Sequence, residues 1–273
     1  MKILAVVVTY FPEKEVLERN VSLFIDRVDR LIVWENTPAG QAGDYRFIEE
    51  GGKIEYRGEG RNAGISHALN YALGEALDKG YDFLLTMDQD SQLEGIDSAI
   101  EYARKTGGNA LYGPVVNEKA SKTNLLAKFL ITSGMLVPVK LLESLGGYEE
   151  DFFTDGIDAD LCCRALDAGA ELRIPAGYAI KQRLGTEERG NFLWMHPVLR
   201  NYSPERLYGI YRNHIIVIGR YRSTGWLKRR FLKVWILRRL WQIPLLEKNG
   251  REKLKSALKG LRDGLRYKSA QIL

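Results

Sequence analysis

Two aspartates follow directly after an apolar stretch of the chain. The stretch Tyr81–Met87 predicts a buried strand, and Asp88 and Asp90 come immediately after it in the sequence M-D-Q-D-S. Unpaired carboxylates are costly to bury, and a hard divalent cation with oxygen ligands offsets that cost. The pair therefore predicts a Mg²⁺ or Mn²⁺ site of the kind that also binds substrate phosphates. The alternative is a solvated pair in a loop, and the D-x-D spacing alone does not separate the two.

A second group of carboxylates lies in Asp151–Asp160, where four aspartates and two phenylalanines occur within ten residues. Asp158 falls at the start of a predicted helix, where the helix dipole favours an ionised carboxylate. Such a carboxylate beside a reacting hydroxyl can act as a general base, although a simple N-cap is the alternative. We assign Asp155 and Asp158 to a site, and Asp160 with Arg164 to a surface i, i+4 pair.

A glycine-rich loop precedes another predicted helix. Gly58-Glu59-Gly60 gives a G-x-G but lacks the G-x-G-x-x-G spacing of dinucleotide-binding enzymes, and no Walker motif occurs in the chain. A dehydrogenase and a P-loop enzyme are therefore disfavoured. The next residues, Arg61–Gly64, still predict a loop whose backbone can approach a nucleotide.

Strands alternate with helices along the first half of the chain, which predicts a doubly wound, mostly parallel α/β sheet flanked by helices. In such sheets ligands bind at the carboxyl ends of the strands. The predicted strands are Lys2–Thr9, Arg30–Glu35, Lys53–Arg57, Tyr81–Met87, Asn109–Val116, Lys128–Val137, Glu171–Ile174 and Tyr178–Lys181. The predicted helices run from Pro12 to Val28, from Ile65, and over Ile96–Ala103, Asp158–Ala168 and Pro204–Tyr221.

Seven short motifs in one order resemble the glycosyltransferase family 2 enzymes of GT-A fold, and more closely their bacterial rhamnosyltransferase-like branch. The resemblance runs through most of residues 3–222, and D-Q-D-S is typical of that branch. The motifs are V-V-T-Y at 7–10, E-N-T-P at 35–38, N-x-G-I-x-x-A-x-N at 62–70, D-Q-D-S at 88–91, T-S-G at 132–134, G-G-Y-x-x-D-F-F-x-D-x-x-D-x-D-L-x-x-R at 146–164 and S-P-x-R-x-Y-x-x-Y-R-N at 203–213.

This resemblance implies a nucleotide-sugar donor and a role for each matching residue. Thr9, Tyr10 and Glu35 would hold the base and ribose, and Asn62 would lie near the uracil or thymine and its phosphate. Asp88 would contact ribose or metal, and Asp90 would ligate a Mg²⁺ or Mn²⁺ ion that bridges the two phosphates. The remaining roles concern the sugars and the chemistry: Ser133 and Gly134 line the donor sugar pocket, Asp155 binds sugar hydroxyls, Asp158 is the catalytic base and Arg212 offsets the charge of the leaving diphosphate.

One position departs from the family pattern. Members often carry a further metal-binding histidine in a segment like H-x-x-G-D, whereas this chain has Gln182-Arg183-Leu184-Gly185-Thr186 there. His196 lies fourteen residues further on and is the alternative ligand, although a lone histidine is more often structural. His67 and His214 are expected to pack or hydrogen-bond.

The formal net charge of +5 is unevenly distributed. Residues 226–273 contain 14 Lys/Arg and three Asp/Glu, a net +11, which leaves net −6 for residues 1–225. We divide the chain into a catalytic domain, 1–222, and a basic helical extension, 223–273. Residues 226–268 combine apolar stripes, tryptophan and basic side chains, the composition of a helix that binds anionic membrane surfaces. Docking of these helices on the acidic domain is an equally weighted alternative.

The location follows from what the chain does not contain. No apolar run approaches the roughly 18 residues that a transmembrane helix needs, and the apolar N-terminal strand is too short for a signal peptide. The two cysteines, Cys162 and Cys163, are adjacent and cannot staple the fold together. We expect a cytoplasmic protein, peripheral on the inner membrane face if the extension binds lipid.

Together with these observations, the resemblance implies a metal-dependent inverting glycosyltransferase that moves L-rhamnose from dTDP-rhamnose to a saccharide, lipid-linked if the extension meets the membrane, in cell-surface polysaccharide synthesis. A UDP-sugar donor and an inactive nucleotide-sugar-binding scaffold are the alternatives. Nucleic-acid binding is disfavoured, because the body is acidic and no nucleic-acid motif occurs.

Overall fold

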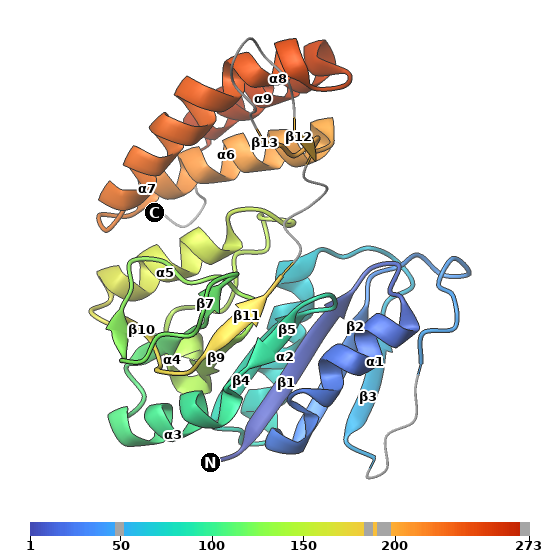
Figure 1. Ribbon diagram of the computed structural model, residues 1–273, viewed down its shortest axis with the longest axis vertical. Helices are drawn as coiled ribbons and strands as arrows, with labels where there is room; N and C mark the ends of the chain where they lie inside the picture. Colours follow the sequence, from blue (N-terminus) through green and yellow to red (C-terminus); the bar gives the residue numbers. More distant parts are fainter. Residues whose placement is uncertain (47–51, 183–187, 190–197, 268–273) are drawn as a thin grey trace. The chain divides into compact units, whose positions relative to one another are not determined.

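The computed structural model describes residues 1–46, 52–182, 188–189 and 198–267 (Figure 1). The chain forms two compact units. Met1–Phe153 and Arg164–Gln182 make up the first, which we call the sheet unit, and Thr154–Cys163 and Arg183–Leu273 make up the second, which we call the helical unit.

The sheet unit is built on an eight-stranded sheet in the order β3-β2-β1-β4-β9-β6-β10-β8. The first four strands are parallel, β9 is antiparallel to both of its neighbours, and β8 is antiparallel to β10. A second sheet has the order β5-β11-β7. The strands are β1 Ile3–Thr9, β2 Arg30–Glu35, β3 Ile54–Gly58, β4 Phe83–Asp88, β5 Gln92–Glu94, β6 Ala110–Tyr112, β7 Val115–Val116, β8 Leu125–Leu126, β9 Met135–Pro138, β10 Glu171–Ile174 and β11 Ala179–Lys181.

Strand β1 is apolar along its length because both of its faces are covered. Ile3, Ala5 and Val7 belong to one buried cluster with residues of α1 and α3, while the alternate residues Leu4 and Val6 are buried outside that cluster. Helices α1 and α2 cover opposite faces of the sheet (Figure 1). The helices of this unit are α1 Lys14–Ser22, the short 3₁₀ helix η1 Ile25–Arg27, α2 Ile65–Asp78, α3 Ile96–Thr106 and α4 Val139–Ser144. The predicted doubly wound, mostly parallel sheet is confirmed.

Two predicted strands are shorter than expected. The stretch Asn109–Val116 forms β6 and β7 in different sheets, because Pro114 has no N–H with which to continue the ladder. The stretch Lys128–Val137 contributes only its end to β9. Gly134, with φ +76°, turns the backbone immediately before that strand, which a continuous strand does not permit.

The helical unit contains one long helix and a chain of helical segments. Ser203 is the N-cap of helix α6, and its side chain accepts a hydrogen bond from the Arg206 N–H. Pro204 follows in the first turn of the helix. The elements are the strands β12 Glu188–Arg189 and β13 Val198–Leu199, helix α6 Pro204–Arg220, α7 Gly225–Arg230, the π-helix η2 Phe231–Arg239, α8 Leu240–Leu246 and α9 Gly250–Arg266. Helix α5, Ile157–Asp167, begins in this unit and ends in the sheet unit.

Helix α9 packs closely on α6 because glycine occupies the contact. A Cβ atom on Gly260 would lie 2.4 Å from the Tyr208 carbonyl oxygen, and one on Gly264 would lie 2.7 Å from that of Arg212. Helix α9 of the basic extension therefore docks on α6, which lies within the predicted catalytic domain 1–222. Docking of the extension on that domain was the alternative to membrane binding. The compact helical unit thus begins before residue 222. A functional boundary at that residue stays a prediction.

The extension stays helical across a proline, a residue that usually interrupts a helix. Pro244 lies inside α8, and the helical conformation continues from Gly225 to Leu246 through the π-helical segment. Pro244 has no N–H to bond to a carbonyl of the preceding turn, so the helix lacks one hydrogen bond at this position. No helix among the described residues is long and apolar enough to cross a membrane.

Candidate functional site

Three predicted site residues meet at one edge of the sheet. Thr9 ends β1 and pairs in register with Glu35 at the end of β2, and on the other side of β1 Val8 pairs with Asp88 at the end of β4. Glu35 in turn pairs with Gly58, the last residue of β3. The carboxyl ends of four parallel strands therefore carry the candidate site, at the position where open α/β sheets bind ligands.

A pocket of about 450 Å³ opens beside Glu35. The Glu35 Oε1 atom accepts a hydrogen bond of 2.6 Å from the Thr37 N–H. The Oε2 atom is buried and accepts no hydrogen bond of standard geometry from the described residues, and the Tyr45 hydroxyl interacts with the same carboxylate. A carboxylate in a pocket wall can accept a hydrogen bond from an N–H group of a ligand. The lining residues are Glu35, Thr37, Pro38, Ala39, Ala42, Gly43, Tyr45, Arg46, Tyr56, Arg57, Gly58 and Gly60.

Tyr45 and Tyr56 give the same pocket an aromatic side. Their rings contact edge to face with centroids 5.8 Å apart. Burial, followed by the neighbouring Glu35 carboxylate, raises the pKa of Tyr45 to about 12, so its phenol stays neutral at physiological pH. Aromatic rings next to a hydrogen-bond acceptor are suited to a planar, polar group such as a nucleobase.

Thr9 and Tyr10 differ in what they can contact. Thr9 is fully buried, and its hydroxyl donates to the Trp34 carbonyl over 3.1 Å, so its side chain joins β1 to β2 and does not face a ligand. Tyr10 is half exposed. Its backbone is held at both ends by Gln89, which accepts from the Tyr10 N–H at 2.8 Å and donates to the Tyr10 carbonyl at 3.1 Å. Gln89, the middle residue of D-Q-D, therefore connects the D-Q-D-S motif to the V-V-T-Y motif. Sequence analysis did not identify this role.

Asn62 lies in a loop that a second unpredicted residue holds in place. The Asn62 Oδ1 atom accepts from the Gly64 N–H at 3.1 Å, which closes a turn. Asn36, directly after β2, accepts from the Ala63 N–H at 3.2 Å and donates to the Gly64 carbonyl at 3.2 Å. Asn36 stands inside the E-N-T-P motif, and its contacts over 27 and 28 residues explain why an asparagine suits that position.

The D-Q-D-S and T-S-G motifs are bonded to each other. Ser133 accepts from the Asp88 N–H at 3.1 Å and donates to the Ser91 hydroxyl at 3.0 Å. The Gly134 N–H donates to the Thr86 carbonyl at 2.7 Å, and a Cβ there would lie 2.9 Å from the Pro114 side chain. Because Ser133 is almost fully buried, its hydroxyl supports the end of β4 in this structure.

The donor set at the end of β4 fits a hard cation, because Asp88 and Asp90 both present oxygen and both are partly exposed. Across the described ranges, no group of three or more His, Cys, Asp or Glu side chains could hold a metal ion. His196, the alternative ligand, lies outside the described residues. Gln182, which sequence analysis treated only as a missing histidine, places its side-chain nitrogen 2.5 Å from the Asp88 Oδ2 atom.

His67 and His214 hydrogen-bond as expected. His67 shares a hydrogen bond of 2.8 Å with Glu59. The Nδ1 atom of His214 lies 2.8 Å from the Ile210 carbonyl.

The other predicted residues lie in the helical unit, where polar contacts hold them. Arg206 binds both carboxylate oxygens of Asp155, at 3.2 and 3.3 Å, and Asn213 donates to the Asp155 carbonyl at 2.6 Å. Asp158 lies in the first turn of α5 and is partly exposed. Arg212 donates to the Asn213 side chain at 2.8 Å and stacks over the Tyr267 ring, with 5.0 Å to its centroid.

The expectation that Asp160 belongs to a surface ion pair is wrong. Asp160 is 1% exposed and accepts a hydrogen bond of 2.7 Å from the Tyr221 hydroxyl, with Arg220 3.5 Å away. Arg164 donates to the Leu145 carbonyl at 2.6 Å. The i, i+4 spacing could not predict the contact between Asp160 and Tyr221, because the two residues are 61 positions apart in the sequence.

Comparisons with known proteins agree with this arrangement. The chain is 25% identical over 290 residues to dTDP-rhamnosyl transferase RfbF of Shigella flexneri, covering 97% of this chain and 95% of the relative. No protein-family profile matches the chain. Its structure is similar to that of S. aureus TarS 1-349 in complex with UDP-GlcNAc, with TM-score 0.62, 16% identity and coverage of 97% of this chain and 81% of the other.

A second solved structure, GalNAc-T7 with UDP, GalNAc and Mn²⁺, has TM-score 0.61 and 11% identity over 85% of this chain. The chain spans about half, 49%, of that protein. These likenesses confirm the GT-A type of fold and the resemblance to rhamnosyltransferase-like glycosyltransferases. They also support a glycosyltransferase that uses a nucleotide sugar.

Proposed function

We propose that the protein is an inverting glycosyltransferase that transfers L-rhamnose from dTDP-rhamnose to a saccharide acceptor. The observation that carries this proposal is the Glu35 carboxylate oxygen in a pocket at the carboxyl end of the sheet, next to the rings of Tyr45 and Tyr56. A thymine ring presents an N–H of the kind that this oxygen accepts. The likeness to a dTDP-rhamnosyl transferase over 97% of the chain supports the choice of donor.

The proposed mechanism is a single displacement. The acceptor oxygen forms a bond to the anomeric carbon while the bond to the diphosphate oxygen breaks, and the hydroxyl proton passes to the Asp158 carboxylate. Asp88 and Asp90 would hold a divalent cation, and such a cation would stabilise the negative charge of the diphosphate. Arg212 adds a positive charge for the same leaving group, and Asp155 binds sugar hydroxyls.

A thermal-shift screen with nucleoside diphosphate sugars tests the donor. With Mg²⁺ or Mn²⁺ present, dTDP-rhamnose is expected to raise the melting temperature more than UDP sugars do, because at equal concentration the ligand that binds more tightly stabilises the folded protein more. A larger shift with a UDP sugar would contradict the proposed donor and support the alternative one.

Asp158→Asn tests the catalytic role. Loss of the general base is expected to lower the transfer rate by about 10²–10⁴-fold. Binding of dTDP-rhamnose should stay as in the wild type, because only proton removal is lost. Asp97→Asn, at an exposed carboxylate paired with Arg27, is the matched control and should keep full activity. Full activity of Asp158→Asn would remove that residue from the mechanism, and a wild-type protein that binds donor without turnover would identify a scaffold.

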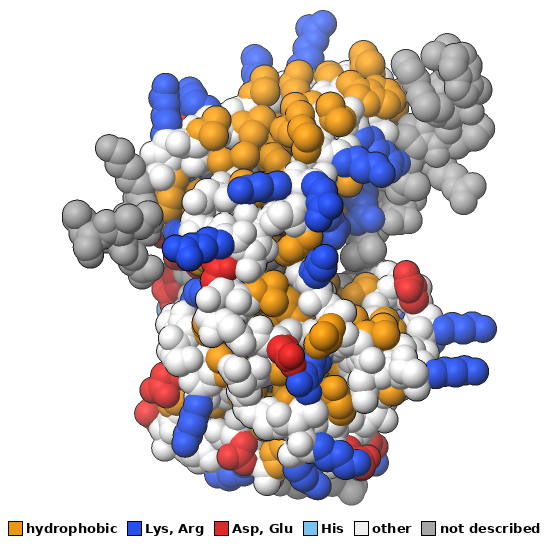
Figure 2. Space-filling view, turned by 90° about the vertical axis from the view of Figure 1, so that its left-hand side faces the viewer, with side chains coloured by type: hydrophobic (Ala, Val, Ile, Leu, Met, Phe, Trp, Pro, Cys, Tyr) orange, Lys and Arg blue, Asp and Glu red, His pale blue; other side chains and the backbone are white. Residues whose placement is uncertain are grey.

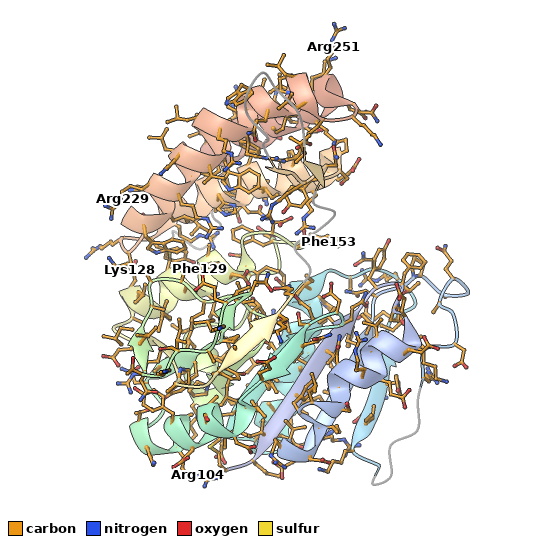
Figure 3. The ribbon with its side chains drawn as sticks, in the orientation of Figure 1. Arg104, Lys128, Phe129, Phe153, Arg229 and Arg251 are labelled. Atoms are coloured by element: carbon orange, nitrogen blue, oxygen red, sulfur yellow. The ribbon has the colours of Figure 1, made fainter. Side chains whose placement is uncertain are left out.

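The outer surface of the helical unit supports contact with an anionic membrane. Leu232, Leu237 and Leu245 are 55%, 64% and 62% exposed. Figure 2 shows hydrophobic side chains gathered on one face of this unit with lysine and arginine side chains around them. Arg229 and Arg251 point away from the unit (Figure 3). Exposed leucines with basic neighbours are typical of a surface that lies in the headgroup region, where a lipid-linked acceptor would be present.

Point variants test the membrane contact better than deletion of the extension, because deletion would remove Phe231 and Ala257 from the core of the helical unit. The double change Leu237→Ser and Leu245→Ser is expected to reduce co-sedimentation with vesicles that contain anionic lipid. Leu126→Ser, at a leucine 74% exposed in the sheet unit, is the control. Equal pelleting of all three proteins would argue against this surface.

A further inference from the structure

Gln182 stands where the family pattern has a metal-binding histidine, and it reaches the candidate metal site. It directly follows β11, and its side-chain nitrogen lies 2.5 Å from the Asp88 Oδ2 atom. The two residues are 94 positions apart in the sequence. At the position where the family pattern has a histidine, this chain therefore has an amide that contacts the Asp88 carboxylate.

The backbone of Gln182 is held firmly in this position. Its N–H donates to the Asn117 side chain at 2.9 Å, and its carbonyl accepts from the same side chain at 3.0 Å. Asn117 is itself anchored, because its N–H donates to the Ile180 carbonyl at 2.9 Å. Strand β11 pairs on one side with β7 and on the other with β5, the strand that follows the D-Q-D-S motif. A residue fixed in this way is pre-organised for binding.

The side-chain amide of Gln182 has two chemically different ends. Its NH₂ group donates to a carboxylate, while its carbonyl oxygen binds a cation. A half-turn about the last side-chain bond exchanges these two ends, and that terminal torsion is soft. In the orientation observed, the NH₂ group of Gln182 donates a hydrogen bond to Asp88. In the opposite orientation, the Gln182 carbonyl oxygen would face the Asp88 carboxylate and the candidate metal site.

We propose that Gln182 is a third protein ligand of the cation and makes the site an all-oxygen one. The inference rests on the proposed role of Asp88 and Asp90 as metal ligands. Glutamine and neutral histidine carry the same charge, so the replacement alters the kind of donor and not the net charge. Oxygen donors suit both Mg²⁺ and Mn²⁺, whereas an imidazole nitrogen is a poorer ligand for the hard Mg²⁺ ion than for the transition metal Mn²⁺. The predicted consequence is a stronger preference for Mg²⁺ over Mn²⁺ than a histidine at this position would give.

Direct metal binding tests the proposal without reliance on turnover. The full-length protein, saturated with dTDP, is titrated with Mn²⁺ by electron paramagnetic resonance, and Mg²⁺ affinity is then measured by competition. Gln182→Ala is expected to weaken both ions by about 10-fold or more, the range found when groups that support a metal site are removed. Gln182→His should recover Mn²⁺ more than Mg²⁺ and so shift the ratio of the two affinities toward Mn²⁺.

Three control variants distinguish a specific role of Gln182 from a nonspecific effect of mutation and from loss of the metal site. Lys181→His places an imidazole one residue earlier, at an exposed side chain paired with Glu94, and should leave the affinity ratio unchanged. Asp88→Asn should lose both ions, and Asp158→Asn should bind them as the wild type does. Circular dichroism melts confirm folding, with Gln182→Asn as a second, more conservative variant if Gln182→Ala does not fold.

The outcomes are distinct for this inference and for the proposed function. Unchanged Mg²⁺ and Mn²⁺ affinities in the folded Gln182 variants would overturn the role of Gln182 and leave the metal-dependent transferase standing. A wild-type protein that binds neither ion with dTDP present would instead overturn the metal site itself, and with it this inference, while donor binding by Glu35 could still be measured.

Discussion

The sheet unit and the helical unit use polar side chains in opposite ways. In the sheet unit the interior is apolar, and the polar groups stand at the ends of strands, where Glu35 and Asp88 face the candidate site. In the helical unit charged groups are buried inside. The Glu247 side chain is fully buried between Arg239, at 2.7 Å, and Lys253, at 3.1 Å.

This difference follows from how each unit satisfies its backbone. A sheet joins distant parts of the chain through main-chain hydrogen bonds, so its side chains can remain apolar inside and its strand ends can hold functional groups. Helices satisfy their own backbones, so only side chains join one helix to another. In the helical unit a small apolar cluster is supplemented by ion pairs that connect η2, the end of α8 and α9. Exposed leucines then remain on the outside.

The largest expected effect is on the buried charges of the helical unit. Glu247→Ala leaves Arg239 and Lys253 buried without their carboxylate, which is expected to destabilise this unit by about 3–5 kcal/mol. Hydrogen exchange should show faster opening of α8 and α9 with little change in β1. Glu252→Ala, at an exposed glutamate of α9, is the control. Equal loss of protection in β1 would show that the two units unfold together and would break the comparison.

The next effect concerns Glu35, a polar group of the sheet unit that we propose contacts the nucleotide. Glu35→Gln replaces a carboxylate acceptor with an amide and is expected to weaken dTDP binding by about 1.5–3 kcal/mol, the value of a hydrogen bond to a charged group. Isothermal titration calorimetry measures the change, and Glu18→Gln on the exposed side of α1 is the control. The melting temperature should hardly change. A large drop in stability with unchanged affinity would make Glu35 a structural residue like Glu247.

One substitution should have opposite signs in the two units. Gly260→Ala places a methyl group 2.4 Å from the Tyr208 carbonyl and is expected to destabilise the α6–α9 contact by about 1–3 kcal/mol. Gly74→Ala in α2 meets open space and should stabilise its helix by up to about 1 kcal/mol. Urea denaturation of both variants measures the pair. A stabilising Gly260→Ala would show that α9 does not need this close approach.

A smaller effect is expected from pH. Burial lowers the pKa of His214, with Arg230 opposing and Asp155 favouring the protonated form. The ring stacks on Phe231 with centroids 5.7 Å apart. The unfolded chain binds this proton near pH 6.5, whereas the folded chain binds it only at lower pH. In that window the unfolded state holds more protons, so stability falls as the pH is lowered through about 6.5.

His214→Phe keeps an aromatic ring and removes the titration. The variant should lose less stability than the wild type between about pH 7.5 and about pH 5, as followed by thermal melts. The same pH dependence in both proteins would show that His214 does not carry the effect.

Much of the sheet and its edge could be predicted from local pattern. The predicted strands Arg30–Glu35 and Glu171–Ile174 match β2 and β10 residue for residue. Because carboxyl ends of neighbouring parallel strands meet, Thr9, Glu35 and Asp88 could be expected at one edge, and they lie there. The burial of Thr9 could not be predicted, because it depends on the Trp34 carbonyl of the neighbouring strand.

The interior of the helical unit was less predictable. Asp160 and Arg164 matched an i, i+4 surface pair, yet Asp160 is buried against Tyr221. Asp155, expected to bind sugar, is held by Arg206. Helical periodicity describes one helix at a time, whereas these partners come from other segments of the chain.

The sequence by itself determined the order of strands and helices, the motifs that resemble a glycosyltransferase and the charge difference between the body and the extension, because these depend on neighbouring residues and on composition. Only the tertiary structure decided which polar groups meet. Gln182 reaches Asp88 across 94 residues, Asn36 holds the Asn62–Gly64 loop, and Glu247 neutralises Arg239 and Lys253 inside the helical unit. Such contacts depend on long-range packing, which no local spacing specifies.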